Sequence, residues 1–473
     1  MGGLTIVDKS LHFKTITELA GLIESRQLSS IEVTSAQLAR IEELDARLQS
    51  YATVMADSAM IQASRADAEI AGGRYRGPLH GVPIAVKDLC FTRGVRTMGG
   101  TRVMADFVPR FDATVVSRFD AAGAVLLGKL NLTEGAMDGY NPDRGVPVNP
   151  WNADRWSGTS SSGSGVATAA GLCYGCLGSD TGGSIRLPAS ACGVVGIKPT
   201  WGRVSRYGVL ALAESLDHVG PMTRSTADAG IMLQTIAGFD PNDPTSLPVP
   251  APDMLEGIDQ GVRGLRLGFD AQYACDGVDP DLARAVRDSV KLLGELGAEI
   301  IEVELPPLEE YLAAWPVLCS AEAALAHEAN YPSRRDDYGP WFQGWLDLGA
   351  SVSGVDYARA NNLRAACNGR MRDALSGVDA LVCPSMPGPA FPVENMAPFA
   401  PLSKKGLETS LLRFTAPYDF NGTPTLSVPC GMSADGLPLG LQIVGKHMQE
   451  PLLCRIGHAY EKATQWHHLH PPV

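Results

Sequence analysis

The sequence predicts an α/β protein built as one large domain around a largely interior β-sheet. Short apolar runs alternate with helical patterns along much of the 473-residue chain, and strands that alternate with helices favour a sheet buried between helices. No repeat, low-complexity tract or break in composition marks a linker. We therefore expect residues 1–473 to form a single domain, although length alone would suit about three domains.

The first eighty residues are predicted to be helical. Thr15–Glu18 and Ser29–Glu32 both match the capping box, in which a hydroxyl caps a helix and a Glu three residues later reaches back. Apolar side chains then recur near helical spacing between Val33 and Leu48. A turn-rich segment at 74–83 leads into the short apolar run Ile84–Asp88, which carries one lysine.

After this run, the pattern alternates between the two kinds of element. Amphipathic or small-residue patterns predict helices at 114–122, 163–171 and 279–296. Short apolar runs predict strands at 124–127, 194–198, 265–269 and 299–303. Residues 384–403 are rich in Pro and predict a loop.

Composition and charge exclude several partners. The net charge is −13 and no run is rich in Lys or Arg, which argues against nucleic acid. The longest apolar stretch, Val166–Leu177, falls short of the ~20 residues that a membrane span needs, and the N-terminus lacks a signal-peptide pattern. Ten dispersed cysteines predict reduced thiols, and hence a cytoplasmic protein whose partner is a small molecule.

Two short motifs could suggest a cofactor or a metal, and both are incomplete. Gly123–Leu130 has P-loop spacing, but Leu130 occupies the position where a hydroxyl would hold magnesium. Cys173 and Cys176 have metal-ligand spacing without a second pair of ligands. We expect no cofactor and no metal.

Two Gly/Ser-rich segments, 157–166 and 178–188, have either of two explanations. They could form a flexible linker, but the residues between them are apolar, and Asp180 and Arg186 are unlike linker residues. A nucleophilic serine needs an adjacent base and N–H donors aimed at the oxyanion. The glycines in Thr181–Ser184 would let successive N–H groups converge on such a point.

Lys87 is the candidate base. It is the one charge that follows the apolar run Ile84–Val86, and burial shifts a lysine toward the neutral amine that a base requires. Ser–Lys pairs are an alternative to His-centred triads. The other interpretation is a structural lysine paired with Asp88, while His80 and His218 have no context typical of a catalytic base.

Three blocks in order, Gly81–Asp88, 157–165 and Asp180–Arg186, resemble the amidase signature family, and further blocks extend the resemblance from about Thr15 to Lys462. The resemblance implies a mixed central sheet covered by helices on both faces. It also implies hydrolysis of an amide through an acyl-enzyme and a Ser–cis-Ser–Lys triad. The expected regions are a helical N-terminal segment at 1–75, a catalytic core at 80–225, a variable substrate-side region at 240–405 and a C-terminal return to the core at 406–473.

Residue by residue, the resemblance makes Ser184 the nucleophile, Ser160 the bridging serine in a cis peptide with the residue before it, and Lys87 the base. It also implies three groups of helpers: an oxyanion hole at Thr181, Gly182, Gly183 and Ser184; supporting residues Ser161, Asp180 and Arg186; and a substrate pocket at Ala136, Met137 and Asp138. One departure stands out, because Thr159 and Ser162 replace two glycines usual in the family.

Several alternatives remain open at this stage. The chain resembles a stand-alone amidase most, the glutaminase (A) subunit of the glutamyl-tRNA amidotransferase next, and a non-catalytic binder least. The substrate could be an aryl amide, an aliphatic amide, an ester or a carbamate, and a homodimer is one option for the assembly. Four aromatic residues could line a cleft or form core: Trp315, Trp341, Phe342 and Trp345.

Overall fold

The computed structural model describes residues 9–393 and 411–473. The strands are β1 (Tyr51–Val54), β2 (Pro83–Lys87), β3 (Val125–Leu130), β4 (Gly175–Asp180), β5 (Val195–Lys198), β6 (His218–Thr223), β7 (Arg266–Phe269), β8 (Glu299–Glu302), β9 (Ala380–Pro384), β10 (Thr425–Met432) and β11 (Pro438–Gly445). The α-helices are α1 (Ile16–Glu24), α2 (Ser30–Leu48), α3 (Ala56–Ala71), α4 (Thr114–Ala122), α5 (Ser162–Ala169), α6 (Arg186–Cys192), α7 (Thr226–Ile236), α8 (Ala271–Cys275), α9 (Pro280–Glu295), α10 (Glu309–Ala326), α11 (Pro340–Ser351), α12 (Gly354–Ala374), α14 (Ala416–Phe420) and α15 (Glu450–Lys462).

The strands of the described residues form one mixed sheet in the order β1-β3-β2-β4-β6-β5-β10-β11-β9-β7-β8. Strand β2 lies parallel to both β3 and β4, whereas β4 pairs antiparallel with β6. Because parallel strands end at the same edge of a sheet, the carboxyl ends of β2 and β4 lie side by side. These two ends carry the predicted site residues Lys87 and Asp180.

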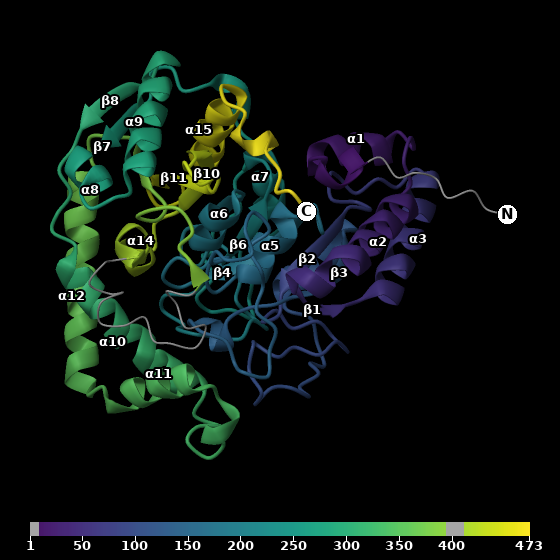
Figure 1. The fold of residues 1–473 in the computed structure, drawn as a ribbon, viewed down its shortest axis with the longest axis horizontal. Coiled ribbons are helices and arrows are strands. Elements are labelled where there is room, and N and C mark those ends of the chain that lie inside the picture. The colour runs from purple at the N-terminus through teal and green to yellow at the C-terminus, as the bar shows by residue number, and fades with distance from the viewer. Residues whose placement is uncertain (1–8, 394–410) are drawn as a thin grey trace.

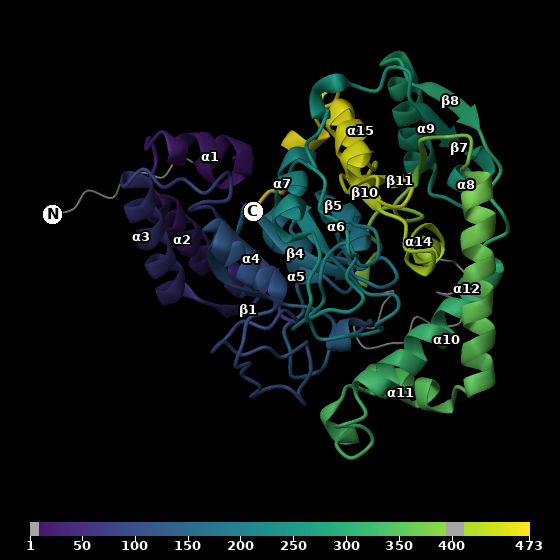
Figure 2. The same cartoon turned by 180° about the vertical axis from the view of Figure 1, so that it is seen from behind.

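Helices cover both faces of this sheet, as the resemblance implies. In Figure 1, α5 and α6 lie in front of the central strands, and in Figure 2 the opposite face carries α4, α7 and α15. Helices α1–α3 pack at the β1 end of the sheet. Helices α10–α12 form a separate group at the other side of the molecule, away from α1–α3 (Figures 1 and 2).

Most of the elements expected from the sequence are confirmed. Both capping boxes form, at Thr15 and Ser29, and helix α4 has the predicted bounds. The all-helical prediction for the first eighty residues is wrong at Tyr51–Val54, which forms the edge strand β1. This strand is only four residues long, so it carries too little alternation to stand out between two helices. Of the loop predicted for 384–403, residues 394–403 lie outside the described residues.

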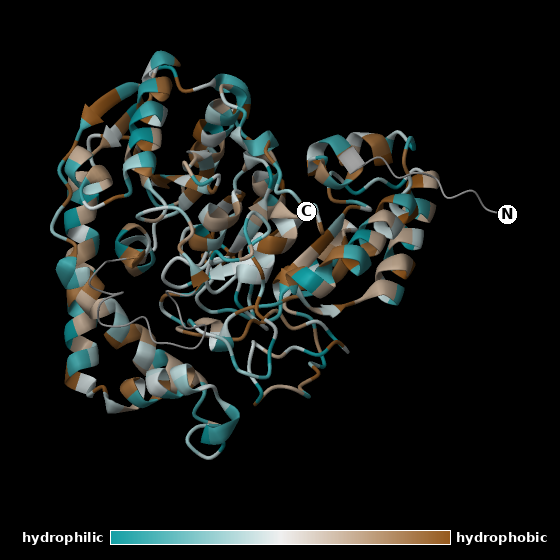
Figure 3. Ribbon diagram, in the orientation of Figure 1, coloured by the Kyte–Doolittle hydropathy of each residue, from teal (hydrophilic) through white to brown (hydrophobic). Residues whose placement is uncertain are grey.

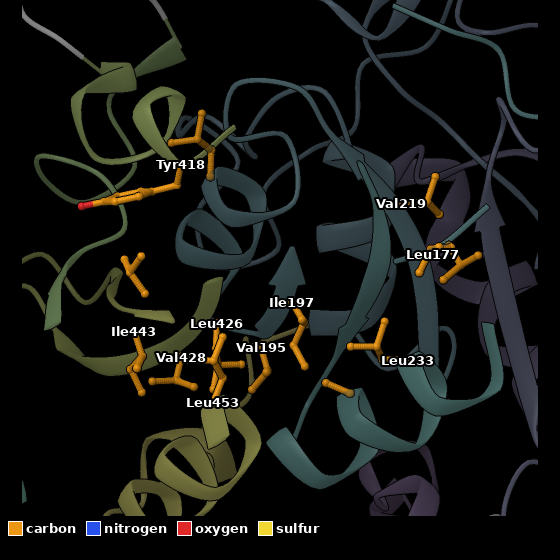
Figure 4. Close-up of a cluster of buried hydrophobic side chains, with 14 of the residues drawn as sticks. Leu177, Val195, Ile197, Val219, Leu233, Tyr418, Leu426, Val428, Ile443 and Leu453 are labelled. Carbon is orange, nitrogen blue, oxygen red and sulfur yellow. The ribbon is translucent and has the colours of Figure 1, made fainter. Parts of the chain in front are cut away.

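The core lies between the sheet and its helices. Figure 3 shows apolar residues gathered at the centre and polar residues on the outer helices. In Figure 4, Leu177, Val195, Ile197 and Val219 project from central strands toward helix residues such as Leu233, and all five are buried. Such close-packed apolar contacts make the sheet a rigid frame for the side chains at its edge.

Two further predictions can be compared with the structure. All ten cysteines are unpaired thiols, as expected. Within the described ranges, we find no helix whose length and apolar character would let it cross a membrane.

Candidate active site

The candidate site lies where two strands end and two helices begin. Strand β2 ends at Lys87, β4 ends at Asp180, α5 begins at Ser162, and α6 begins at Arg186. The two Gly/Ser-rich segments are the connections at this edge: one leads into α5, and the other joins β4 to α6. The structure therefore brings together the three blocks that are separate in the sequence.

Lys87 is fully buried and surrounded by serine hydroxyls. Its Nζ lies 2.6 Å from Ser160 Oγ, 3.0 Å from Ser161 Oγ and 2.9 Å from Ser179 Oγ. Ser161 is itself fixed to β4, because its hydroxyl accepts from the Ser179 N–H and donates to the Ser179 carbonyl. The alternative pairing with Asp88 does not form, because Asp88 instead binds the buried Lys129 at 3.0 Å.

Burial favours the neutral form of this lysine. It lowers the pKa of Lys87 from 10.5 to about 7, although the carboxylate of Asp180 opposes the shift. Lys198 on β5 is also fully buried, and burial likewise lowers its pKa to about 7. Lys198, however, contacts the Thr423 carbonyl at 2.6 Å and His218 at 3.2 Å rather than the serines. Of these two lysines, Lys87 is the one that combines a lowered pKa with contact to a site hydroxyl.

Ser184 lies at the start of α6 and is 8% exposed, whereas Ser160 and Ser161 are completely buried. Its carbonyl accepts a hydrogen bond from the Ser161 N–H at 3.3 Å, which fixes the loop of Ser184 beside the segment of Ser160. The Thr159–Ser160 peptide bond is cis, as the resemblance implies. Ser184 is thus the most accessible of the three serines.

The loop Thr181–Ser184 presents several backbone N–H groups. Gly183 has a φ of +132°, a conformation that suits glycine alone. Its N–H already donates to Asp180 Oδ1 at 2.7 Å. The N–H groups of Thr181, Gly182 and Ser184 have no acceptor among the described residues.

Asp180 and Arg186 form the frame beneath this loop. Arg186 binds Asp180 through Nε at 3.0 Å and through Nη2 at 2.8 Å, and it also binds Asp419 at 2.5 Å. Burial alone would raise the pKa of Asp180, but the Arg186 guanidinium outweighs it and holds that pKa below its ordinary value. Burial raises the pKa of Asp419 well above the ordinary range. Asp180 is therefore the charged partner of Arg186.

The predicted pocket residues lie beside Ser160. The Met137 carbonyl accepts hydrogen bonds from the hydroxyls of Thr133 and Thr159, each at 3.1 Å. Asp138 is buried, its Oδ1 accepts the Gly139 N–H, and its Oδ2 has no partner among the described residues. Burial raises the pKa of Asp138 to about 6.

The two departures from the family pattern act in this same contact. Thr159 supplies one of the hydroxyls that bind Met137, and the Ser162 hydroxyl accepts from Tyr140 at 2.8 Å. Both replacements therefore tie the Ser160 segment to residues 133–140.

A cavity of about 610 Å³ lies next to these residues, and Ala136 belongs to its wall. The wall is mostly apolar, with a few polar groups from α10 and α12. It includes Leu89, Leu132, Leu210, Leu325, His327 and Tyr357.

Three residues of the site have no signal in the local sequence. Trp315 on α10 donates from Nε1 to the Thr181 carbonyl at 2.8 Å, and Thr415 donates to the Gly182 carbonyl at 2.6 Å. Asp419 belongs to the Arg186 cluster. Ser179, the third hydroxyl at Lys87, directly precedes Asp180 in a block that the sequence does mark. Of the four aromatic residues that could line a cleft or form core, Trp315, Phe342 and Trp345 are core.

Comparisons with known proteins agree with this geometry. The model of the Amidase family matches residues 32–454. A relative named putative amidase AmiD, from Mycobacterium tuberculosis H37Rv, is 47% identical over 97% of this chain and 96% of its own length. The glutaminase-type (A) subunit of the glutamyl-tRNA(Gln) amidotransferase from Geobacter sp. M21 is 40% identical over 96% of this chain and 98% of its own length.

A solved structure shows the same fold. The native peptide amidase from Stenotrophomonas maltophilia superposes with a TM-score of 0.84 at 31% identity, over 97% of this chain and 98% of that chain. The fold, the edge where the three blocks meet and the extent of these matches lead to one conclusion. The chain belongs to the amidase signature family and is a hydrolase of amide bonds.

Proposed function

We propose that the protein is a stand-alone amidase that works through an acyl-enzyme, with Ser184 as nucleophile, Ser160 as bridge and Lys87 as base. The observation that carries this proposal is the contact of 2.6 Å between Lys87 Nζ and Ser160 Oγ. It supplies a largely neutral amine beside a hydroxyl in the segment that adjoins Ser184. A lysine kept neutral by burial can accept a proton near pH 7.

The reaction follows from these positions. Neutral Lys87 takes the proton of Ser160, which takes the proton of Ser184 as Ser184 Oγ attacks the amide carbonyl carbon. The carbon–nitrogen bond then breaks, and the proton returns through Ser160 to the leaving amine. Water attacks the resulting ester by the same route in reverse, which releases the carboxylic acid and restores Ser184.

The oxyanion that forms on the carbonyl oxygen needs donors that are already in place. Within the proposed hole of Thr181, Gly182, Gly183 and Ser184, the N–H of Gly183 is engaged by Asp180. The proposal therefore assigns the stabilisation to the N–H groups of Thr181, Gly182 and Ser184. Ser161, Asp180 and Arg186 support the loop and do not react.

The substrate is a small molecule with an amide bond. The proposal places Ala136, Met137 and Asp138 at the substrate pocket, since this segment is bonded to Thr159, next to Ser160. The unpartnered Oδ2 of Asp138 can accept from a substrate N–H. The adjoining cavity of about 610 Å³ has the size and the mostly apolar wall typical of ligand sites. We therefore expect amides with an apolar or aromatic substituent to be preferred.

The second candidate is the glutaminase subunit of a tRNA-dependent amidotransferase. The 40% identity to such a protein over nearly the full length favours it. This interpretation requires a partner protein that receives ammonia, whereas the stand-alone interpretation requires none.

A hydrolysis panel on the purified chain alone distinguishes the two. It compares glutamine with an aryl amide, an aliphatic amide, an ester and a carbamate, and it quantifies the released acid and amine. We expect turnover of an apolar amide by the chain alone, with kcat/KM well above that for glutamine. Activity on glutamine alone, or activity that appears only with a co-purifying partner, would support the amidotransferase role instead.

A further inference from the structure

The glycine-containing loop Thr181–Ser184 is held by side chains from distant parts of the chain. Trp315 Nε1 donates to the Thr181 carbonyl at 2.8 Å, across 134 residues of sequence. Thr415 Oγ1 donates to the Gly182 carbonyl at 2.6 Å, across 233 residues. Both side chains are buried, with Trp315 3% exposed and Thr415 fully enclosed, so water does not compete for these bonds.

Each contact fixes a whole peptide group rather than one oxygen. A trans peptide is planar, and its C=O and N–H point in opposite directions. The bond to the Thr181 carbonyl therefore also sets the direction of the Gly182 N–H. The next peptide is held from both sides, because its carbonyl accepts from Thr415 while its N–H, that of Gly183, donates to Asp180.

These contacts depend on the absence of side chains at both glycines. A Cβ at Gly182 would come within 2.5 Å of the Trp315 ring, and a Cβ at Gly183 within 2.7 Å of Thr415 Oγ1. Trp315 and Thr415 thus occupy space that only glycine leaves open. Two adjacent glycines also have the freedom to rotate their peptides, and the two side chains remove that freedom.

We propose that Trp315 and Thr415 are positioning residues that hold the Gly182 N–H in the direction of the oxyanion. This inference rests on the proposed function, because it concerns the donors of the proposed oxyanion hole. A donor that is fixed in advance stabilises developing charge without reorganisation during the reaction. Loss of either contact should therefore slow the chemical step more than it weakens substrate binding.

The chain offers a matched control for Trp315. Trp345 is 6% exposed, packs 6.0 Å from Trp315 between ring centroids, and its Nε1 has no acceptor among the described residues. Trp315→Phe and Trp345→Phe remove the same ring volume, but only the first removes a hydrogen bond to the loop. Thr415→Val and Thr415→Ser form the second pair, because only serine keeps the hydroxyl.

Steady-state kinetics on the best amide of the panel, with thermal unfolding of each variant, test the inference. We expect Trp315→Phe and Thr415→Val to lower kcat by about 10- to 100-fold with KM changed less than about threefold. Trp345→Phe and Thr415→Ser should keep kcat within about threefold of the parent. Equal losses of kcat in both members of each pair, or losses in KM alone, would overturn the inference.

Two results keep this outcome separate from other failures. If Trp315→Phe does not fold, the Thr415 pair decides, since valine and serine are close in size to threonine. If Ser184→Ala retains parental turnover, the proposed function itself is wrong, whatever the Trp315 and Thr415 variants do.

Discussion

Alanine in place of Ser184 is expected to lower kcat for amide hydrolysis by at least about 10⁴-fold, because the chain then has no group to form the acyl-enzyme. The fold should persist, since the Ser184 side chain makes no hydrogen bond to the described residues and its carbonyl contact to Ser161 belongs to the backbone. Stopped-time assays of product release, together with circular dichroism, check both expectations.

Ser190→Ala is the matched control for this change. Ser190 lies on α6 close to Ser184, is buried, and its hydroxyl has no hydrogen-bond partner among the described residues. Its loss should leave kcat within about twofold of the parent, because a hydroxyl without a partner contributes little. Parental activity in Ser184→Ala would remove Ser184 from the mechanism.

Replacement of Lys87 by alanine is the second large effect. The proposed base contributes about 10²- to 10⁴-fold, and its loss also leaves three serine hydroxyls without their shared partner. In the parent, the active form is the neutral amine. With a folded pKa of about 7, deprotonation proceeds as pH rises, so kcat/KM should increase between pH 6 and pH 8. This increase should vanish in Lys87→Ala.

Lys198 separates this explanation from its main competitor. It is the other buried lysine on a central strand whose pKa burial brings to about 7, so it could in principle produce the same profile. Lys198→Met should keep the increase between pH 6 and pH 8, whatever its effect on the maximum rate. A profile that disappears in Lys198→Met and survives in Lys87→Ala would assign the titration to Lys198 instead.

The parts of the fold that depend on local interactions are predictable from the sequence. The capping boxes at Thr15 and Ser29 involve residues three apart, and both form. The order of the strands is different, because β10 and β11 lie between β5 and β9 in the sheet. Such pairings depend on contacts between segments hundreds of residues apart, which periodicity does not encode.

The same distinction applies to the site. Lys87, Ser160, Asp180 and Ser184 lie within short blocks whose composition is unusual for a linker or a core, so they can be singled out. Trp315 is different, because its role depends on where helix α10 packs. An indole in an apolar helix is usually core, and nothing near residue 315 in the sequence indicates a contact with Thr181.

Mass spectrometry of the acylated protein tests the central assignment most directly. The purified chain is mixed with its best substrate, quenched in acid within the first turnovers, digested and mapped. The mechanism predicts that the mass of the acyl group is added to the peptide that contains Ser184, and that this adduct is absent in Ser184→Ala. An acyl group on Ser160 or on any other residue, or turnover without any adduct under conditions that trap one in known serine hydrolases, would contradict it.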